Sequence, residues 1–385
     1  MIQKKLPRQT LDELQPLKRD FRSVSPLPKP PVVTDTIDEK MFNTRKAIKL
    51  DDIIAKYKAN GKGFCAALID SGVAHHKDID DAITERICCN ESEKSKKEED
   101  IYDLLGHGTH IAGLIAGRGE SVAGKGVANE AMILSLKVTN GSGGDASWFN
   151  IVKAFKEIIK RVKKWNPADP MISVVNLSIN GGDNLMRSNL MQSHELVKCI
   201  ERLNKEYNIP VVVSSGNNFE RFRKYGVAYP AYNHNVISVG AVVNFPFEGY
   251  VMDTIAPFSQ RIPPFTKDAP CFILAPGVFS VSLDIKGGYG YMTGTSLAAP
   301  IVTGIILLMQ QIAIGSKPKS YKDLPPVAVL MKCLTAGGDE VKNIPHDSTP
   351  ADKKNVYYDS LVYKRINTVE IIKELIKPQE PKKPK

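Results

Sequence analysis

The sequence lacks the segments that would direct it out of the cell or into a membrane. Met1 to Val24 contains no apolar run of the kind found at the centre of a signal peptide. No stretch reaches the roughly 18 apolar residues of a membrane helix. The longest apolar run, "IVTGIILLMQQI" at 301–312, suits a buried core helix. We therefore expect a cytoplasmic protein with no membrane partner.

Cysteine is scarce and its spacing excludes the usual cysteine sites. No CxxC occurs, and the adjacent Cys88 and Cys89 do not have zinc-ligand spacing. Without a secretion signal, reduced thiols are expected at all six positions, which are Cys65, Cys88, Cys89, Cys199, Cys271 and Cys333. The sequence predicts neither a disulfide framework nor a cysteine-bound metal.

Basic residues are in excess, but they do not form a nucleic-acid surface. The 385-residue chain has a net charge of +10, and much of the excess lies at its two ends. No cluster interleaves aromatic residues with Arg and Lys, so we expect no nucleic-acid partner. Composition divides the chain into a charged, proline-containing arm (1–38), one folded domain (39–378) and a basic tail (379–385).

Within the folded domain, apolar runs of strand length alternate with amphipathic helical patterns. The expected strands are 63–70, 131–138, 171–179, 209–217, 236–243 and 271–277. The expected helices are 42–58, 107–117, 150–165, 194–208, 326–334 and 367–376, with one more that begins near Ser296. Strands that are apolar throughout predict an α/β fold with a mostly parallel central sheet and helices on both faces. The exception is expected near residues 238–283, where no long helix separates the strands.

Four polar residues stand at the ends of these elements. Asp70 ends a strand, while His107 and Ser296 each open a helix. Such positions gather reactive groups in parallel sheets. Each of these residues, taken alone, is more commonly a turn, packing or capping residue. Together they supply an orienting acid, a general base and a nucleophile, since serine needs an imidazole to take its proton. Asn217, at another strand end, offers a donor for an oxyanion.

The stretches around these residues resemble the subtilisin-like serine proteases. They are "ALIDSGV" at Asp70, "GHGTHIAGLIAG" at His107, "VVNLSI" at Ser178, "SSGN" at Asn217 and "GTSLAAP" at Ser296. The order Asp, His, Ser is also that of the family. The resemblance implies a subtilisin-like fold and a serine endopeptidase acting on proteins or peptides. In that reading Asp70 orients His107, His107 is base and then acid, Ser296 attacks, and Asn217 helps to bind the oxyanion.

The same resemblance assigns the residues that would bind substrate. Ser178, Ile179 and Asn180 match the strand to which a substrate backbone adds, while Gly216 and Ala228 lie near the primary specificity pocket. Asn180 and Ala228 stand where the family usually has glycine, which predicts a narrower pocket. The sequence does not specify which substrate side chain the pocket prefers.

Two features of the family are missing or incomplete. The irregular N-terminal residues do not form the family's compact inhibitory pro-domain. We expect instead that the arm, which contains the extended "LPKPP", restrains activity. Asp78 matches a family calcium ligand, but Glu120 stands where an asparagine is expected. No cofactor is expected to be required, and a structural calcium stays open.

Two other functions remain alternatives. Acyl transfer to an amine, as in the peptide-maturing and macrocyclising relatives, is accompanied by a large insertion between the Asp and His motifs. Asp70 and His107 are only 37 residues apart, which leaves little room for one. A non-catalytic scaffold is disfavoured because all four catalytic-type residues are present.

Overall fold

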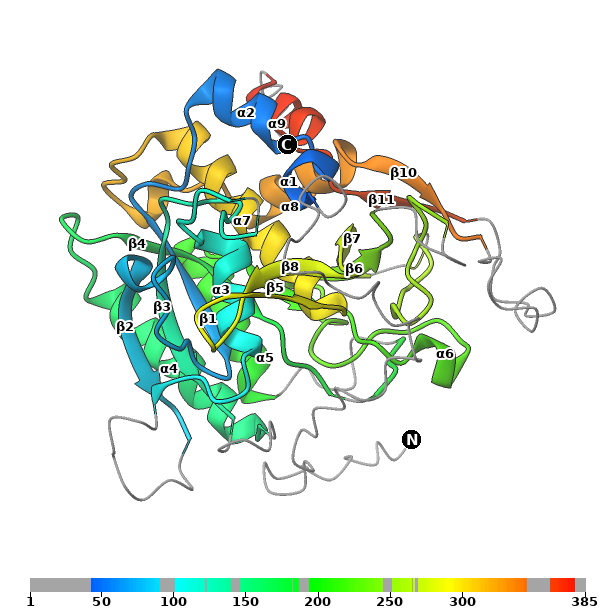
Figure 1. Cartoon of the computed structure of the whole chain (residues 1–385), viewed down its shortest axis with the longest axis horizontal. Coiled ribbons are helices and arrows are strands. Elements are labelled where there is room, and N and C mark those ends of the chain that lie inside the picture. The colour runs from blue at the N-terminus through cyan, green and yellow to red at the C-terminus, as the bar shows by residue number, and fades with distance from the viewer. Residues whose placement is uncertain are drawn as a thin grey trace, which may run out of the picture.

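The computed structural model describes residues 43–90, 101–121, 123–139, 146–181, 183–186, 194–244, 251–264, 266, 269–344 and 361–377. The arm (1–38), the basic tail (379–385) and nearly all of the charged stretch 90–100 lie outside the described residues. Figure 1 shows the chain from its N-terminal helices to its C-terminal helix; α2 (Leu50–Tyr57) packs beside α9 (Thr368–Ile376).

Nine strands within the described residues form one central sheet. In spatial order they are β10 (Asp339–Lys342), β11 (Val362–Arg365), β7 (Cys271–Pro276), β6 (Val236–Val242), β5 (Val211–Ser214), β4 (Met171–Leu177), β1 (Phe64–Asp70), β3 (Met132–Lys137) and β2 (Ile83–Cys88). Every neighbouring pair is parallel except β10 and β11. The predicted α/β fold with a mostly parallel sheet is confirmed.

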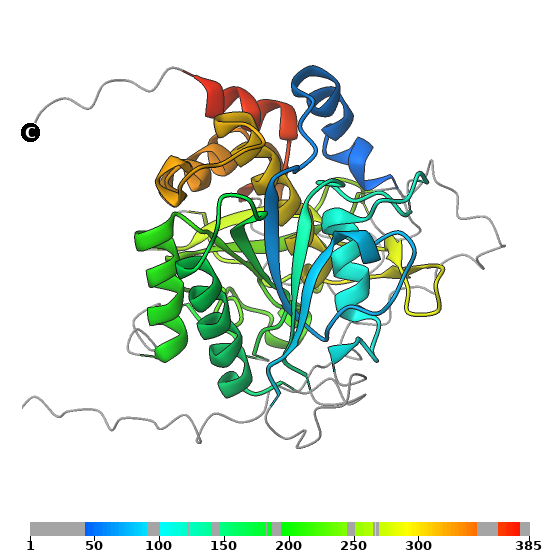
Figure 2. The same ribbon diagram turned by 90° about the vertical axis from the view of Figure 1, so that its left-hand side faces the viewer.

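Helices cover both faces of this sheet. Figure 2 shows α4 (Trp148–Lys163) and α5 (Glu195–Tyr207) on one side and α3 (His107–Ala116) on the other. The helix α7 (Thr295–Ile314) packs against α3 and against β4 to β7. The remaining helices are α1 (Thr44–Ala47), α6 (Phe219–Phe222) and α8 (Val327–Ala336). All residues of β1, β4 and β6 are buried, as strands covered on both faces must be.

The helix α7 is longer than the sequence suggested. Its 20 residues are long and apolar enough to cross a membrane, so the expectation that no segment reaches that length is wrong. Of its most apolar 18-residue window, 83% is buried inside the protein. It is apolar on all sides because other elements surround it.

The sequence misplaced the exception to the parallel pattern and overlooked several short strands. β6 and β7 pair in parallel although no helix was expected between them. The antiparallel pairs are β10 with β11 at the sheet edge and a separate hairpin, β8 (Ser280–Leu283) with β9 (Tyr289–Met292). β2, "ITERIC", is half exposed, and β10, "DEVK", is mostly polar. Such edge strands lack the continuous apolar run that identifies a central strand.

Candidate active site

The predicted catalytic residues lie where three neighbouring strands end. β1 ends at Asp70, and β4 and β5 lead into Ser178 and Asn217. The helices α3 and α7 begin beside them, with His107 as the first residue of α3 and Ser296 as the second of α7. The carboxyl end of a parallel sheet is the usual place for a ligand site.

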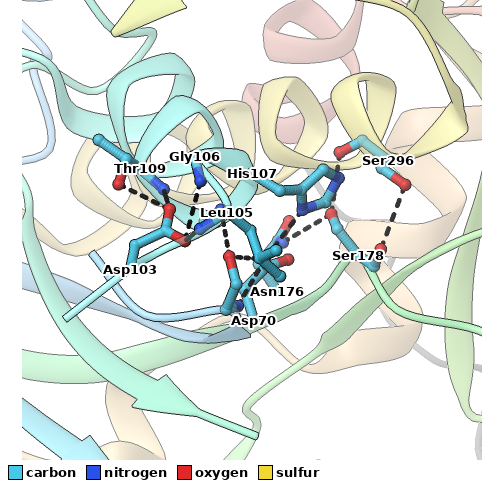
Figure 3. Close-up of polar contacts among 11 residues, drawn as sticks. Asp70, Asp103, Leu105, Gly106, His107, Thr109, Asn176, Ser178 and Ser296 are labelled. Carbon is cyan, nitrogen blue, oxygen red and sulfur yellow. Dashed lines mark hydrogen bonds and ion pairs between the residues drawn. The ribbon is translucent and has the colours of Figure 1, made fainter. Parts of the chain in front are cut away.

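Asp70 and His107 form a buried pair. The Nδ1 of His107 lies 2.8 Å from Oδ1 of Asp70, and these side chains are only 5% and 0% exposed. The backbone N–H of Ser71 also donates to Oδ1 of Asp70, at 2.7 Å. A carboxylate accepts, so the proton of a neutral imidazole lies on Nδ1, and Nε2 is left to accept. Figure 3 shows the imidazole between Asp70 and Ser296.

The first turn of α3 is fixed by Asp103. Its Oδ1 accepts from the backbone N–H of Leu105 and Gly106, and its Oδ2 accepts from the N–H and hydroxyl of Thr109, at 2.7 to 3.0 Å. A carboxylate at this end of the helix is also favoured by the helix dipole. Gly108 lets α3 approach the segment that follows β1, because a Cβ there would stand 2.1 Å from the carbonyl oxygen of Gly72. These contacts set the position of His107.

Ser296 is held by an exchange of hydrogen bonds with Ser178. Pro300 lies inside α7 and has no N–H to donate to the carbonyl of Ser296, four residues earlier. The hydroxyl of Ser178 donates to that carbonyl instead, at 2.9 Å. In return Oγ of Ser296 lies 3.2 Å from the carbonyl oxygen of Ser178. The proline therefore leaves free the carbonyl acceptor that joins Ser296 to the end of β4.

Further side-chain hydrogen bonds join α7 to β4 along the helix, and we call this set of contacts the seam between α7 and β4. Thr303, seven residues after Ser296, donates to Oδ1 of Asn176 at 2.8 Å, and Nδ2 of Asn176 donates to the Ser178 hydroxyl at 3.0 Å. Seven residues further on, Gln310 exchanges hydrogen bonds with Ser173 at 2.6 and 2.9 Å. These buried polar contacts fix the register of the helix on the strand, because each would leave an unsatisfied group if the helix slid.

Asn217 is oriented by Thr295, the residue before Ser296. Its Oδ1 accepts from the backbone N–H of Thr295 at 2.9 Å and from the Thr295 hydroxyl at 2.8 Å. That hydroxyl in turn accepts from the N–H of Gly216 at 3.1 Å. With the carbonyl half of the amide occupied, the NH₂ group is the half left to donate, and no other described residue accepts from it. An oxyanion site needs a donor held in advance in this way.

The residues predicted to bind substrate flank this centre. Ser178 and Ile179 are buried, at 3% and 2% exposed. Asn180 is half-buried, and its Nδ2 donates to the hydroxyl of Ser214 at 2.8 Å and to the Ser214 carbonyl at 3.3 Å. Gly216 has a φ of +109°, which favours glycine. Ala228 is buried and donates its N–H to the carbonyl of Ser215 at 2.8 Å.

Asp78, the calcium candidate, has a different partner. Its Oδ2 accepts from the hydroxyl of Tyr289 at 2.6 Å. The carboxylate fits between Gly119 and Gly124, since a Cβ on either would stand 2.6 or 2.8 Å from that oxygen. Glu120 is exposed. Within the described ranges no group of three or more His, Cys, Asp or Glu side chains could hold a metal. The acidic side chains here do not fit a carboxylate cage for calcium.

Sequence reasoning missed Asp103, Thr295, Thr303 and Pro300. Asp103 could have been found as an acid shortly before an expected helix start. Thr295 is part of the "GTS" motif, but nothing in the sequence tells which residue its hydroxyl meets. The roles of Thr303 and Pro300 depend on the seam between α7 and β4, which only the fold creates.

The chain is similar in sequence to a family of known proteins and to several of its members. Residues 61–330, more than two thirds of the chain, match the model of the subtilase family, Peptidase_S8. The chain is 32% identical to the serine protease AprX of Bacillus subtilis, over 69% of this chain and 60% of AprX. It is 28% identical to the major intracellular serine protease of the same organism, over 69% of this chain and 73% of that protein.

Subtilisin E of Bacillus subtilis is 28% identical over 65% of this chain and 56% of its own length. The chain thus spans between 56% and 73% of the length of these three relatives. The residues matched by the family model include Asp70, His107, Asn217 and Ser296. The chain belongs to the subtilase family.

Proposed function

We propose that this protein is a serine endopeptidase in which Asp70, His107 and Ser296 act as a catalytic triad. One observation carries the proposal: the buried 2.8 Å contact between Asp70 and His107 holds the imidazole between Asp70 and Ser296. Two of the relatives above are named as serine proteases, which supports the same activity. The alternatives of acyl transfer and of a scaffold have no comparable observation in their favour.

In the first half of the reaction, Oγ of Ser296 bonds to the carbonyl carbon of the scissile peptide. Its proton passes to Nε2 of His107, and Asp70 stabilises the imidazolium that forms. The carbonyl oxygen becomes an oxyanion and accepts from Nδ2 of Asn217 and from the backbone N–H of Ser296. The C–N bond then breaks, and His107 returns the proton to the leaving amine.

In the second half, water replaces the amine. His107 takes a proton from the water while its oxygen bonds to the acyl carbon, and the same two donors bind the second oxyanion. The bond to Ser296 breaks, the serine regains its proton from His107, and a carboxylic acid leaves. The seam between α7 and β4 keeps Ser296 in place through both halves.

A fluorophosphonate probe tests the proposal directly. We expect covalent labelling at Ser296, no labelling after Ser296→Ala, and cleavage of unfolded protein substrates by the native protein alone. Mass analysis of the products distinguishes hydrolysis, which adds one water, from transfer to an amine, which does not. Absence of labelling in the folded native protein would exclude the triad.

We also propose that the arm, residues 1–38, restrains this activity and that the protein works in the cytoplasm. The proline-rich "LPKPP" resists cleavage and suits a segment that lies in a protease groove. Two relatives are named as intracellular proteases, and all six cysteines are free thiols. Deleting residues 1–38 should raise peptidase activity several-fold, and unchanged activity in a folded truncation would contradict the restraint.

A further inference from the structure

We propose that Asn180 closes the primary specificity pocket, so that this protease cuts after Gly, Ala or Ser and not after large side chains. The proposal rests on the serine endopeptidase activity proposed above and names its substrate class. It is carried by the hydrogen bonds from Asn180 to Ser214, which join the two walls of the pocket.

The location of the pocket follows from the groups that act on the scissile bond. Its carbonyl must lie between Oγ of Ser296 and Nδ2 of Asn217. β4 and β5 are neighbours and pair in parallel, with Leu177 opposite Val213. The segment 178–180, which follows β4, and the segment 214–217, which begins at the last residue of β5, therefore form two facing walls. The side chain on the acyl side of the scissile bond enters the gap between these walls.

The Asn180 side chain spans this gap. It leaves the first wall and donates to both the hydroxyl and the carbonyl of Ser214 on the second wall. Ser214 is fully buried, so its hydroxyl would lose its partner if the amide swung away. An unsatisfied buried polar group is unfavourable, and the bridge is therefore held closed. A large substrate side chain would have to break both hydrogen bonds to enter.

Gln260 and Ala228 pack closely against Gly216 on the second wall. A Cβ on Gly216 would stand 2.1 Å from Oε1 of Gln260 and 3.0 Å from Cβ of Ala228. Gln260 is fully buried, and its Nε2 donates to the carbonyl of Asp183 at 3.0 Å and to Oδ1 of Asn184 at 2.7 Å. A side chain so fixed does not yield to a ligand. Because Asn180 joins the two walls, we infer that only a hydrogen, a methyl or a hydroxymethyl group fits between them.

A peptide library and one substitution test the proposal. Cuts made by the native protein should follow Gly, Ala and Ser, and kcat/KM for a peptide anilide ending in Ala should exceed that for the matched Phe substrate by about tenfold or more. Asn180→Gly should raise the ratio of kcat/KM for the Phe substrate to that for the Ala substrate by about tenfold. Rates are referred to active sites counted with a fluorophosphonate, so loss of folded protein does not enter them.

The matched control is Asn208→Gly. Asn208 ends α5 with a φ of +53°, which glycine adopts readily, and its side chain contacts Tyr321 instead of the pocket. This variant should keep the native preference. Native cuts after Phe, Tyr or Leu, or an unchanged Phe-to-Ala ratio in Asn180→Gly, would overturn the proposal. A protein that cuts no peptide and is not labelled at Ser296 would overturn the endopeptidase activity itself, which is a separate result.

Discussion

The two sides of Ser296 differ in how closely they keep the pattern of the family. On the catalytic side, Asp70, His107 and Asn217 match its motifs and are each held by buried or partly buried hydrogen bonds. On the pocket side, Asn180 and Ala228 replace the expected glycines, and Asn180 bonds across the gap. The same strand ends carry both sets of residues.

This difference separates the reaction from the choice of substrate. The oxyanion, the imidazolium and the nucleophile are the same for every peptide bond, so their partners have one workable arrangement. The pocket meets only the side chain, and one amide is enough to change what fits. The predictions below test whether the two sides are separable, and they run from the largest expected effect to the smallest.

The largest effect is expected for Asp70→Asn. An amide in place of the carboxylate can donate to Nδ1, which moves the imidazole proton to Nε2 and removes the acceptor for the Ser296 proton. We expect kcat to fall by about 10⁴-fold, with the same ratio of Ala to Phe cleavage. Single-turnover rates and the melting temperature, measured on one preparation, check this. Near-native turnover would mean that His107 is not the base.

The next effect is expected at Asn217. The oxyanion exists in the tetrahedral intermediate and scarcely in the substrate, so Asn217→Ala should lower kcat and spare KM. The expected loss is about 10²–10³-fold, the size that removal of this donor has in subtilisin. Asn217→Asp should be at least as damaging because its charge repels the oxyanion. A lower melting temperature with a normal kcat per active site would instead make Asn217 a turn residue.

The sequence predicted more of the catalytic side than of the pocket side. Its residues fall in motifs at strand ends, and central strands that are apolar throughout locate those ends. The bridge from Asn180 could not be read, because Ser214 is distant in sequence and pairs with it only through the β4–β5 register. The support from Thr303 was invisible for the same reason, whereas Asp103 contacts residues only two to six positions away. The Asp78 prediction failed to specify its partner because Tyr289 lies 211 residues away.

On the catalytic side, buried His110 should make the stability of the fold sensitive to acid. Burial lowers the pKa of His110, on α3, to about 3 from 6.5. The unfolded chain then binds one more proton than the folded protein between these values, so stability is complete above about pH 6.5 and falls as the pH drops below it. The slope from this group reaches about 1.4 kcal/mol per pH unit. Urea unfolding at pH 7, 6 and 5 should show a smaller slope in His110→Gln, and an equal slope would contradict the assignment.

A smaller effect is expected in the seam that holds Ser296. Thr303→Val keeps the shape of the side chain but leaves Oδ1 of Asn176 without its donor, which should cost about 1–3 kcal/mol of unfolding free energy. The matched control is Thr335→Val on α8, where the hydroxyl donates to carbonyls of its own helix. That control should cost little. If both variants unfold alike, the polar contacts do not fix the helix on the strand.

The smallest effect concerns Asp78, which lies apart from both sides. We propose that its hydrogen bond from Tyr289 takes the place of a structural calcium, joining Asp78, which packs against Gly119 and Gly124, to the hairpin of β8 and β9. Tyr289→Phe should then lower the unfolding free energy by about 1 kcal/mol, the net value of one hydrogen bond. Tyr321→Phe is the control, because that hydroxyl has no hydrogen-bond partner among the described residues. A chelator should leave the melting temperature of the native protein and of both variants unchanged. If the chelator lowers the native melting temperature and added calcium restores it, the protein binds a structural calcium. The hydrogen bond from Tyr289 to Asp78 would then not replace that calcium.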